Sequence, residues 1–429
     1  MQYTWAIDAR FVPMHKWSMI KHITHASRLL SLLVGPFLIC HCSVPNAPTG
    51  QSLLEVSVSN PTVDKTGVCY WRSGGSCGTS GDTRKLDVYK PAGGGQGKGV
   101  LLYVHGGAWN GNTSSELNGR SLTTSGSHKA PKLFAQAGWR VLSMDYTSAT
   151  GDGSHTNTIH GGFPSGTTNP GGGSPKTYEA NGLYDVKVAI RYARQQYADP
   201  NGLTLIVMGH SAGGQLATLA ALSANNESSS PFLKPAYPSH LSSVATKVDA
   251  VVNLAGPLDF EPWFTFTDFA SLNGIAPNLG NDVAEFFGCR VPSTNYGGLA
   301  PCRCRGPNDG SLPSTVPACT NGQQPINPVV PKVSAATYAD TQDPPIYVAY
   351  SEKDSLVLPR AGCLTAGTYY NLDRQYEFWV DVIEKSVSPT EHHVYGLNSQ
   401  ALITQFAEAV RGATFPVGNS PPAGEICGL

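Results

Sequence analysis

The sequence predicts an α/β fold, built on a mostly parallel central sheet with helices on both faces. Six short apolar runs, each bounded by turn residues, are rich in Val, Ile and Tyr, which is typical of strands buried on both faces. The runs cover residues 100–104, 141–146, 203–208, 248–255, 346–350 and 378–383. Helical patterns lie between them, and strands that alternate with helices favour parallel pairing through right-handed crossovers.

Three segments carry the helical signal. Apolar side chains recur at helical spacing within 178–197, residues 212–224 are rich in Ala and Leu, and 401–410 ends near a glycine, Gly412. In parallel sheets, ligands bind beyond the carboxyl ends of the strands. We therefore expect the residues that carry chemistry just after the apolar runs.

Two long stretches interrupt the alternation. Residues 147–175 are rich in Gly, Ser, Thr and Pro, and residues 257–344 begin with aromatic side chains and hold four cysteines. Because long excursions inside a compact domain are usually lids or binding loops, we expect 257–344 to form a Cys-containing cap over the site. The alternative is a surface excursion that does not contact a substrate.

The first 42 residues differ from the rest of the chain. Scattered basic residues precede an apolar stretch at 29–40, which is the layout of a signal peptide. A helix that spans a bilayer needs roughly 20 apolar residues, so we expect no stable membrane span after removal of this leader. The sequence thus predicts a leader over 1–42, one domain over 52–429 with insertions at 147–175 and 257–344, and secretion. The alternative is a membrane-tethered protein with an uncleaved leader.

Cysteine content agrees with export. Eight cysteines remain after the leader, and an even set in an exported chain predicts disulfides. Cys69 and Cys77 form the most local candidate pair, whereas Cys302 and Cys304 should each pair elsewhere. No CxxC pair occurs in the sequence, so we expect neither a metal site nor another cofactor.

The charges are nearly balanced. With 29 basic and 30 acidic residues the formal net charge is -1, which gives no electrostatic reason to expect nucleic acid as a partner. We expect a small substrate that is neutral or weakly charged. The oligomeric state has no signal in the sequence.

A nucleophile motif follows the third apolar run. Residues 209–213 read Gly-His-Ser-Ala-Gly, which matches GxSxG, a sharp turn between strand and helix that exposes a serine hydroxyl. A second match at 74–78 lies in a Gly-rich and Ser-rich loop, with no apolar run before it and no helical pattern after it. Ser211 is therefore the candidate nucleophile.

The first apolar run leads directly into His105-Gly-Gly-Ala-Trp109. Glycines at this place allow backbone N–H groups to point into the space above Ser211, where a tetrahedral intermediate would place its negative oxygen. The N–H of Ala212, at the positive end of the following helix, is a further candidate donor.

HGGAW followed by GHSAGG resembles the esterase and lipase branch of the α/β-hydrolases, which includes hormone-sensitive-lipase-like esterases and formamidase-like carboxylesterases. The resemblance covers residues 85–255 well and the region from 344 onward moderately. It implies oxyanion donors at Gly107, Ala108 and Ala212, with Gly106 shaping the turn and His105 supporting the loop. After Met144-Asp-Tyr146 these relatives usually continue Arg-Leu-Ala-Pro, whereas this chain enters the stretch 147–175.

Chain order limits the base. In this fold the nucleophile is followed by the acid and then by the histidine, and only His392 and His393 lie beyond both Ser211 and a plausible acid. We favour His393, because its +1 and +4 neighbours, Val394 and Leu397, are apolar, as in relatives whose catalytic loop packs on the sheet. His392 stays the alternative.

The candidate acid is Asp354, four residues after the run 346–350. Glu352 is the nearest alternative, and Asp259 fits a structural role better. Together the motifs predict cleavage of carboxylic esters through an acyl-enzyme intermediate. The alternatives are a serine peptidase or amidase on the same fold and a non-catalytic binding protein on a hydrolase scaffold.

Overall fold

A computed structural model gives the fold. It describes residues 61–74, 84–109, 120–122, 129–147, 182–228, 233, 237–266, 304, 329–351, 354, 356–372, 378–383 and 397–412. All of these residues belong to one compact unit, Ser57–Leu429.

The strands of this part of the chain form one eight-stranded sheet in the order β1-β2-β4-β3-β5-β6-β7-β8. They are β1 (Val63–Cys69), β2 (Lys85–Tyr89), β3 (Val100–Val104), β4 (Arg140–Met144), β5 (Leu205–His210), β6 (Ala250–Leu254), β7 (Ile346–Ser351) and β8 (Phe378–Ile383). β1 and β2 pair antiparallel, β2 pairs antiparallel with β4, and the six remaining strands run parallel. The predicted mostly parallel sheet is therefore confirmed.

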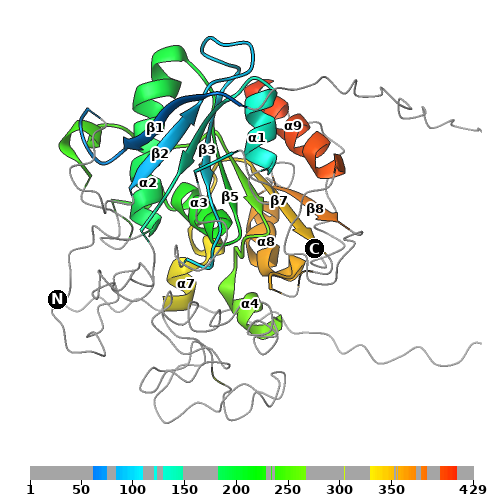
Figure 1. Cartoon of the computed structure of the whole chain (residues 1–429). Helices are drawn as coiled ribbons and strands as arrows, with labels where there is room; N and C mark the ends of the chain where they lie inside the picture. Colours follow the sequence, from blue (N-terminus) through cyan, green and yellow to red (C-terminus); the bar gives the residue numbers. More distant parts are fainter. Residues whose placement is uncertain are drawn as a thin grey trace, which may run out of the picture. The chain divides into compact units, whose positions relative to one another are not determined.

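Helices cover both faces of the sheet (Figure 1). The α-helices are α1 (Lys129–Gln136), α2 (Gly182–Ala193), α3 (Ala212–Leu222), α4 (Phe260–Phe266), α7 (Val329–Val333), α8 (Cys363–Asn371) and α9 (Leu397–Gly412). Short turns of 3-10 or π helix are η5 (Arg194–Ala198), η6 (Asp199–Asn201), η7 (Ser239–Leu241), η8 (Ala335–Tyr338) and η9 (Pro359–Gly362).

The sheet divides the apolar core in two, because successive side chains of a strand point to opposite faces. On one face Leu102 and Val104 of β3 pack with α2, α3, α4, α7 and α8. On the other, Leu101 and Tyr103 pack with α1 and α9. The central strands are buried along their whole length, which explains why they are continuous apolar runs in the sequence.

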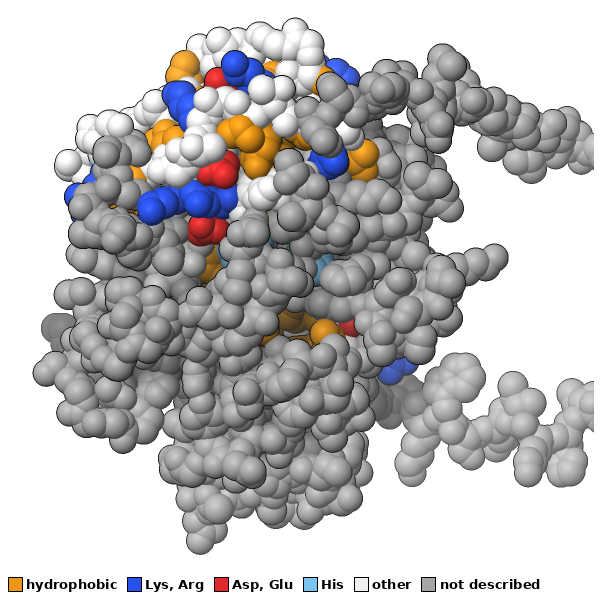
Figure 2. All heavy atoms as spheres, in the orientation of Figure 1, with side chains coloured by type: hydrophobic (Ala, Val, Ile, Leu, Met, Phe, Trp, Pro, Cys, Tyr) orange, Lys and Arg blue, Asp and Glu red, His pale blue; other side chains and the backbone are white. Residues whose placement is uncertain are grey.

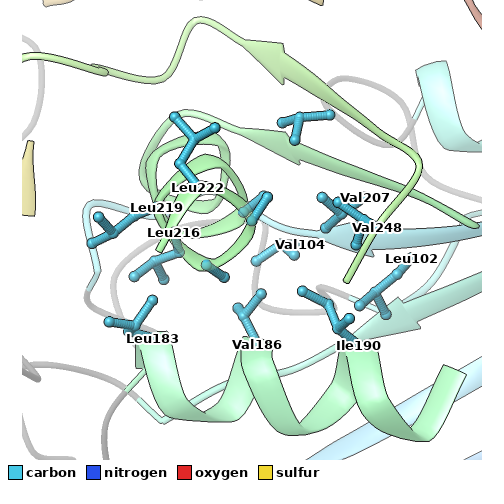
Figure 3. Packing of buried hydrophobic residues seen from close by; sticks show 14 of the residues in the cluster. Leu102, Val104, Leu183, Val186, Ile190, Val207, Leu216, Leu219, Leu222 and Val248 are labelled. Carbon is cyan, nitrogen blue, oxygen red and sulfur yellow. The ribbon is translucent and has the colours of Figure 1, made fainter. Parts of the chain in front are cut away.

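α2 shows why the helical spacing was visible. Leu183, Val186 and Ile190 lie along one side of α2 and point toward α3 and the sheet (Figure 3). At its C-terminal end α2 stops at Ala193, before the predicted 197, because the chain changes to the π-helical turn η5 at Arg194 and then to η6, which contains Pro200.

The described ends of the interval 257–344 lie in the core. Phe260, Trp263 and Phe264 of α4 and Val330 and Val333 of α7 are buried in the same cluster as the sheet. Apart from Cys304, residues 267–328 lie outside the described residues, as does most of 147–175. The predicted cap consists mostly of residues outside the described part of the chain.

One cysteine expectation is wrong. Cys69 is a free thiol, buried at the end of β1, so it does not pair with Cys77. A buried free cysteine behaves as a small apolar side chain. Cys304 and Cys363 are both disulfide-bonded.

The surface carries charges of both signs. On the described part of the face in Figure 2, acidic side chains lie next to basic ones. An example is Arg120, which forms ion pairs with Asp87 (3.3 Å) and Asp145 (2.8 Å). Within the described ranges, no helix combines the length and the apolar composition that crossing a membrane requires.

Candidate active site

Ser211 lies between β5 and α3, at a turn with unusual backbone angles. Its φ is 53° and its ψ is -125°, a conformation that costs an L-residue on the order of 1–3 kcal/mol. Its N–H donates to the carbonyl of Leu254 at the end of β6 (2.8 Å), and its own carbonyl accepts from the N–H of Gln215 (3.1 Å). These bonds hold the strained turn against the neighbouring strand, and the side chain stays half-buried.

The motif glycines are required by the close approach of strand, turn and helix. A Cβ at Gly209 would lie 2.1 Å from the carbonyl oxygen of Gly213. A Cβ at Gly213 would lie 2.2 Å from the carbonyl oxygen of His105 and 2.3 Å from that of Val104. The second contact means that α3 begins against the end of β3, where the HGGAW segment starts.

We call residues His105–Trp109, the segment predicted to supply oxyanion donors, the oxyanion loop. Its last three residues, Gly107, Ala108 and Trp109, all have positive φ, at 113°, 51° and 59°. Such angles turn the backbone away from the path of β3, and two of the three residues are not glycine. Because Val104 pairs with Gly209 across β3 and β5, this loop leaves the sheet beside the turn that holds Ser211.

His105 and Tyr146 support the start of the oxyanion loop. The Nδ1 of His105 lies 2.6 Å from the carbonyl oxygen of Gly106, and since a carbonyl only accepts, this nitrogen carries the proton. The rings of His105 and Tyr146 stack with centroids 4.5 Å apart. The hydroxyl of Tyr146 is shared between the carbonyls of His105 (3.0 Å) and Gly106 (3.3 Å). His105 thus has a supporting role in the loop.

Gln215 and Trp109 support the end of the loop. The indole N–H of Trp109 donates to Oε1 of Gln215 (3.0 Å), and Nε2 of Gln215 donates to the carbonyl of Val333 in α7 (3.2 Å). Both side chains are buried. Neither contact is visible in the sequence, although Trp109 ends the HGGAW motif and Gln215 directly follows GHSAGG. Tyr146 is likewise the last residue of the predicted strand 141–146, two residues beyond the observed end of β4.

Asp354 lies in a tight turn after β7. Its side chain is 1% exposed, and its Oδ1 accepts from the N–H groups of Leu356 (2.8 Å) and Val357 (3.0 Å). Its own N–H donates to the carbonyl of Ser351 (3.1 Å). β5, β6 and β7 are parallel neighbours, so Ser211 and Asp354 follow strands that end at the same edge of the sheet. His392, His393 and Glu352 lie outside the described residues.

An aromatic cluster connects the oxyanion loop with the turn that holds Asp354. Trp109 packs on Phe260 (6.2 Å between centroids) and edge-on against Trp263 (6.5 Å). The indole N–H of Trp263 donates to the carbonyl of Leu356 (2.5 Å). α4 therefore contacts both segments.

Asp259 has structural partners. It is fully buried, and its carboxylate accepts from the hydroxyl (2.6 Å) and the N–H (2.8 Å) of Thr365 in α8 and from the N–H of Ala336 (3.3 Å). Burial raises the pKa of this carboxyl from 3.8 to about 6, against the lowering effect of these hydrogen bonds. The pKa of nearby Tyr350 is also raised, by burial first and then by Asp259 and Asp354.

The described residues hold no cluster of three or more His, Cys, Asp or Glu side chains that could bind a metal ion. Three features of the described residues lie at this edge of the sheet. They are a hydroxyl on a strained turn, a loop of reversed backbone amides and a buried carboxylate.

Comparisons with known proteins show what the chain is similar to. The BD-FAE family model matches residues 176–284, which hold α2, β5, the turn at Ser211 and α3. Esterase LipC of Mycobacterium tuberculosis (strain ATCC 25618 / H37Rv) is 33% identical over 178 residues, which are 40% of this chain and 34% of LipC. The match thus spans about a third of the length of this relative.

Among solved structures, Esterase B from Lactobacillus Rhamnosis (HN001) aligns with a TM-score of 0.50 at 11% identity, over 83% of this chain and 88% of that one. A second structure of Esterase B, inhibited by a C6-C4 SN3 compound, aligns with a TM-score of 0.50 at 12% identity, over 83% and 89%. At this identity the likeness establishes the fold, and the chain shares the α/β-hydrolase fold with these esterases.

Proposed function

We propose that this protein, an α/β-hydrolase by fold with sequence similarity to esterases, cleaves carboxylic esters through an acyl-enzyme on Ser211. The observation that carries the proposal is the strained turn at Ser211, which directly follows β5 and lies beside a loop whose three last residues have positive φ. Backbone angles of this kind persist only where the surrounding structure enforces them, and they concentrate at functional sites.

The reaction needs two displacements. Oγ of Ser211 attacks the ester carbonyl carbon while His393 takes the hydroxyl proton, and the N–H groups of Gly107, Ala108 and Ala212 bind the negative oxygen. The bond to the alcohol oxygen then breaks, and the alcohol leaves with the proton from the imidazolium. Water attacks the acyl carbon with His393 again as base, the bond from this carbon to Oγ breaks, and the imidazolium returns its proton to Oγ, which releases the acid and restores Ser211. Asp354 fixes the tautomer of the histidine and stabilises its charged form.

The substrate in this proposal is a small ester that is neutral or weakly charged. The support is the balanced charge of the chain and the apolar surroundings of the loop, where Trp109, Phe260 and Trp263 pack together. A water-excluding environment strengthens the hydrogen bonds to the oxyanion.

Replacement of the proposed nucleophile tests the function. Ser211→Ala should lower kcat for a p-nitrophenyl acyl ester by a factor on the order of 10⁶, because the members of a catalytic triad act as a unit. Thermal unfolding of the variant serves as the control for folding. Esterase activity that survives in a folded Ser211→Ala protein would reject the proposal.

A comparison of substrates separates ester hydrolysis from peptide or amide hydrolysis on the same site. We expect the purified protein to turn over the acyl ester far faster than a peptide anilide. Preference for the anilide would assign the site to a peptidase or amidase. A protein that turns over neither and resists a fluorophosphonate would be a binding protein on a hydrolase scaffold.

Export is a separate proposal, supported by the basic and apolar layout of residues 1–42. The expected outcome is that the expressed protein accumulates outside the cell and that its N-terminal sequence begins after the apolar stretch 29–40. A full-length chain in the membrane fraction would favour an uncleaved leader that tethers the protein.

A further inference from the structure

We propose that Gln215 is a positioning residue, which holds the oxyanion loop in its strained conformation through the indole of Trp109. The inference rests on the proposed function and adds to it a residue outside the triad and the oxyanion donors. The supporting observation is that Gln215 lies in α3, the helix that begins after Ser211, and that its buried side chain contacts both the oxyanion loop and α7.

Gln215 is tied to the turn at Ser211 by its backbone. It lies one helical turn after Ser211, and its N–H donates to the Ser211 carbonyl (3.1 Å). The whole residue is 1% exposed. Both polar atoms of its side-chain amide are hydrogen-bonded: Oε1 accepts from Trp109 (3.0 Å) and Nε2 donates to Val333 (3.2 Å). With both ends bonded, the amide has a single orientation.

Trp109 connects Gln215 to the backbone of the oxyanion loop. It has a φ of 59° and follows two other residues with positive φ. The backbone conformation of the loop therefore differs strongly from the extended conformation of β3. Its indole is 4% exposed and packs on Phe260 and Trp263. Packing places the ring, and the hydrogen bond to Gln215 fixes its rotation relative to the helix that begins at Ala212.

The consequence concerns distances in the transition state. Gly107 and Ala108 immediately precede Trp109, and the donors must lie within about 3 Å of the oxyanion to stabilise it. If Gln215 no longer binds the indole, the loop can relax toward ordinary backbone angles and move these N–H groups away from Ser211. A displacement of about 1 Å can cost on the order of 100-fold in rate.

The test uses Gln215→Leu, which keeps the approximate size of the side chain and removes both hydrogen bonds. With a p-nitrophenyl acyl ester we expect kcat to fall by about 10-fold to 100-fold, with KM within about twofold of wild type. The pH at half-maximal kcat should not change, because the histidine and its acid are untouched. The rate of covalent modification by a fluorophosphonate should fall with kcat, since that reaction also develops a negative oxygen.

Trp109→Phe supplies the reciprocal change, since it removes the indole N–H and keeps an aromatic ring. It should lower kcat in the same way, and the double variant Trp109→Phe/Gln215→Leu should lose little more than either single variant. If Gln215→Leu fails to fold, Trp109→Phe carries the test alone.

Tyr237→Phe is the matched control. It removes a partly buried hydrogen bond from Tyr237 to Glu227 (2.6 Å), and neither residue belongs to the oxyanion loop or to the turn at Ser211. We expect a lower Tm with unchanged kcat. Gln215→Leu with the same pattern, a lower Tm and a kcat within twofold of wild type, would overturn the positioning role.

Fluorophosphonate labelling separates this inference from the proposed function. A wild-type protein that is labelled while Ser211→Ala is not keeps the proposed function, whatever Gln215→Leu does. A folded wild-type protein that is not labelled at all overturns both.

Discussion

At the scale of single residues, backbone strain is concentrated around Ser211. Among the described residues, those with positive φ other than glycine are Ala108, Trp109, Ser211 and Ala255. Two lie in the oxyanion loop, one is the proposed nucleophile, and Ala255 follows β6 beside Gly256, where a Cβ would lie 2.7 Å from the Ser211 carbonyl oxygen. Strain placed around one hydroxyl indicates that the surroundings hold this hydroxyl in position.

The proposed base can be identified by a pair of neighbouring variants. His393→Ala should lower kcat for an acyl ester by a factor on the order of 10⁶, as the loss of any member that acts with the nucleophile does. His392→Ala should retain activity within about tenfold. The reverse result would make His392 the base, and two fully active variants would contradict a histidine base from this part of the chain.

Asp259 should make stability depend on pH. Its pKa is raised to about 6 by burial, so between pH 4 and pH 6 the folded protein binds a proton that the unfolded chain has lost. Stability from this group is therefore greatest at low pH and is lost as the pH rises through about 6. The raised pKa corresponds to about 3 kcal/mol in the free energy of unfolding.

Asp259→Asn removes the titratable carboxyl group and keeps an oxygen that can accept a hydrogen bond from Thr365. Relative to the variant, the wild-type protein should lose free energy of unfolding between pH 4.5 and pH 7.5, measured by urea denaturation. Asp185, whose pKa burial also raises to about 6, is present in both proteins, so the difference isolates Asp259. An equal difference at the two pH values would contradict the raised pKa.

At the scale of elements, the start of α3 is pressed against the end of β3. Gly213→Ala should be strongly destabilising, by about 3 kcal/mol or more, because its Cβ would meet two backbone oxygens at 2.2 Å and 2.3 Å. Backbone oxygens cannot move aside as the end of a flexible side chain can. The expected readout is a much lower urea midpoint or loss of the folded protein.

Gly202→Ala is the control for this prediction. Gly202 has a φ of 60°, and a Cβ there would meet nothing within 4 Å. It should therefore cost only the strain of a left-handed conformation, about 1 kcal/mol. Equal stability losses in the two variants would show that the contact between α3 and β3 does not explain why position 213 requires glycine.

The elements at the two ends of 257–344 both reach the proposed site. α4 donates from Trp263 to Leu356 beside Asp354, and α7 accepts from Gln215 at Val333. The interval 257–344 therefore begins and ends next to the proposed site, which is the placement expected of a cap. The covering role of the residues between stays a prediction.

At the scale of the whole molecule, burial determined what the sequence could predict. β3, β5, β6 and β7 are buried at every position, so they are apolar runs, and the predicted strands overlap them within a few residues. β1 and β2 were missed. β1 is an edge strand with mostly exposed residues and the sequence VDKTGVC. In β2 two charged residues, Lys85 and Asp87, alternate with the buried ones, so it is not a continuous apolar run.

Some features around Ser211 could be predicted from the sequence and others could not. The turn, the loop and the acid position follow from motifs that are local in sequence. The contacts from Tyr146 to His105 and from Trp109 to Gln215 join residues 41 and 106 positions apart, and no spacing rule relates them. They depend on the order of strands in the sheet, which only the folded structure supplies.

The residue at which a covalent inhibitor reacts identifies the nucleophile. The folded wild-type protein is treated with a fluorophosphonate, digested, and analysed by mass spectrometry of its peptides. We expect a single stoichiometric adduct on Ser211, which forms more slowly in His393→Ala and is absent in Ser211→Ala. An adduct on another residue, or a fully active protein that carries no adduct, would contradict it.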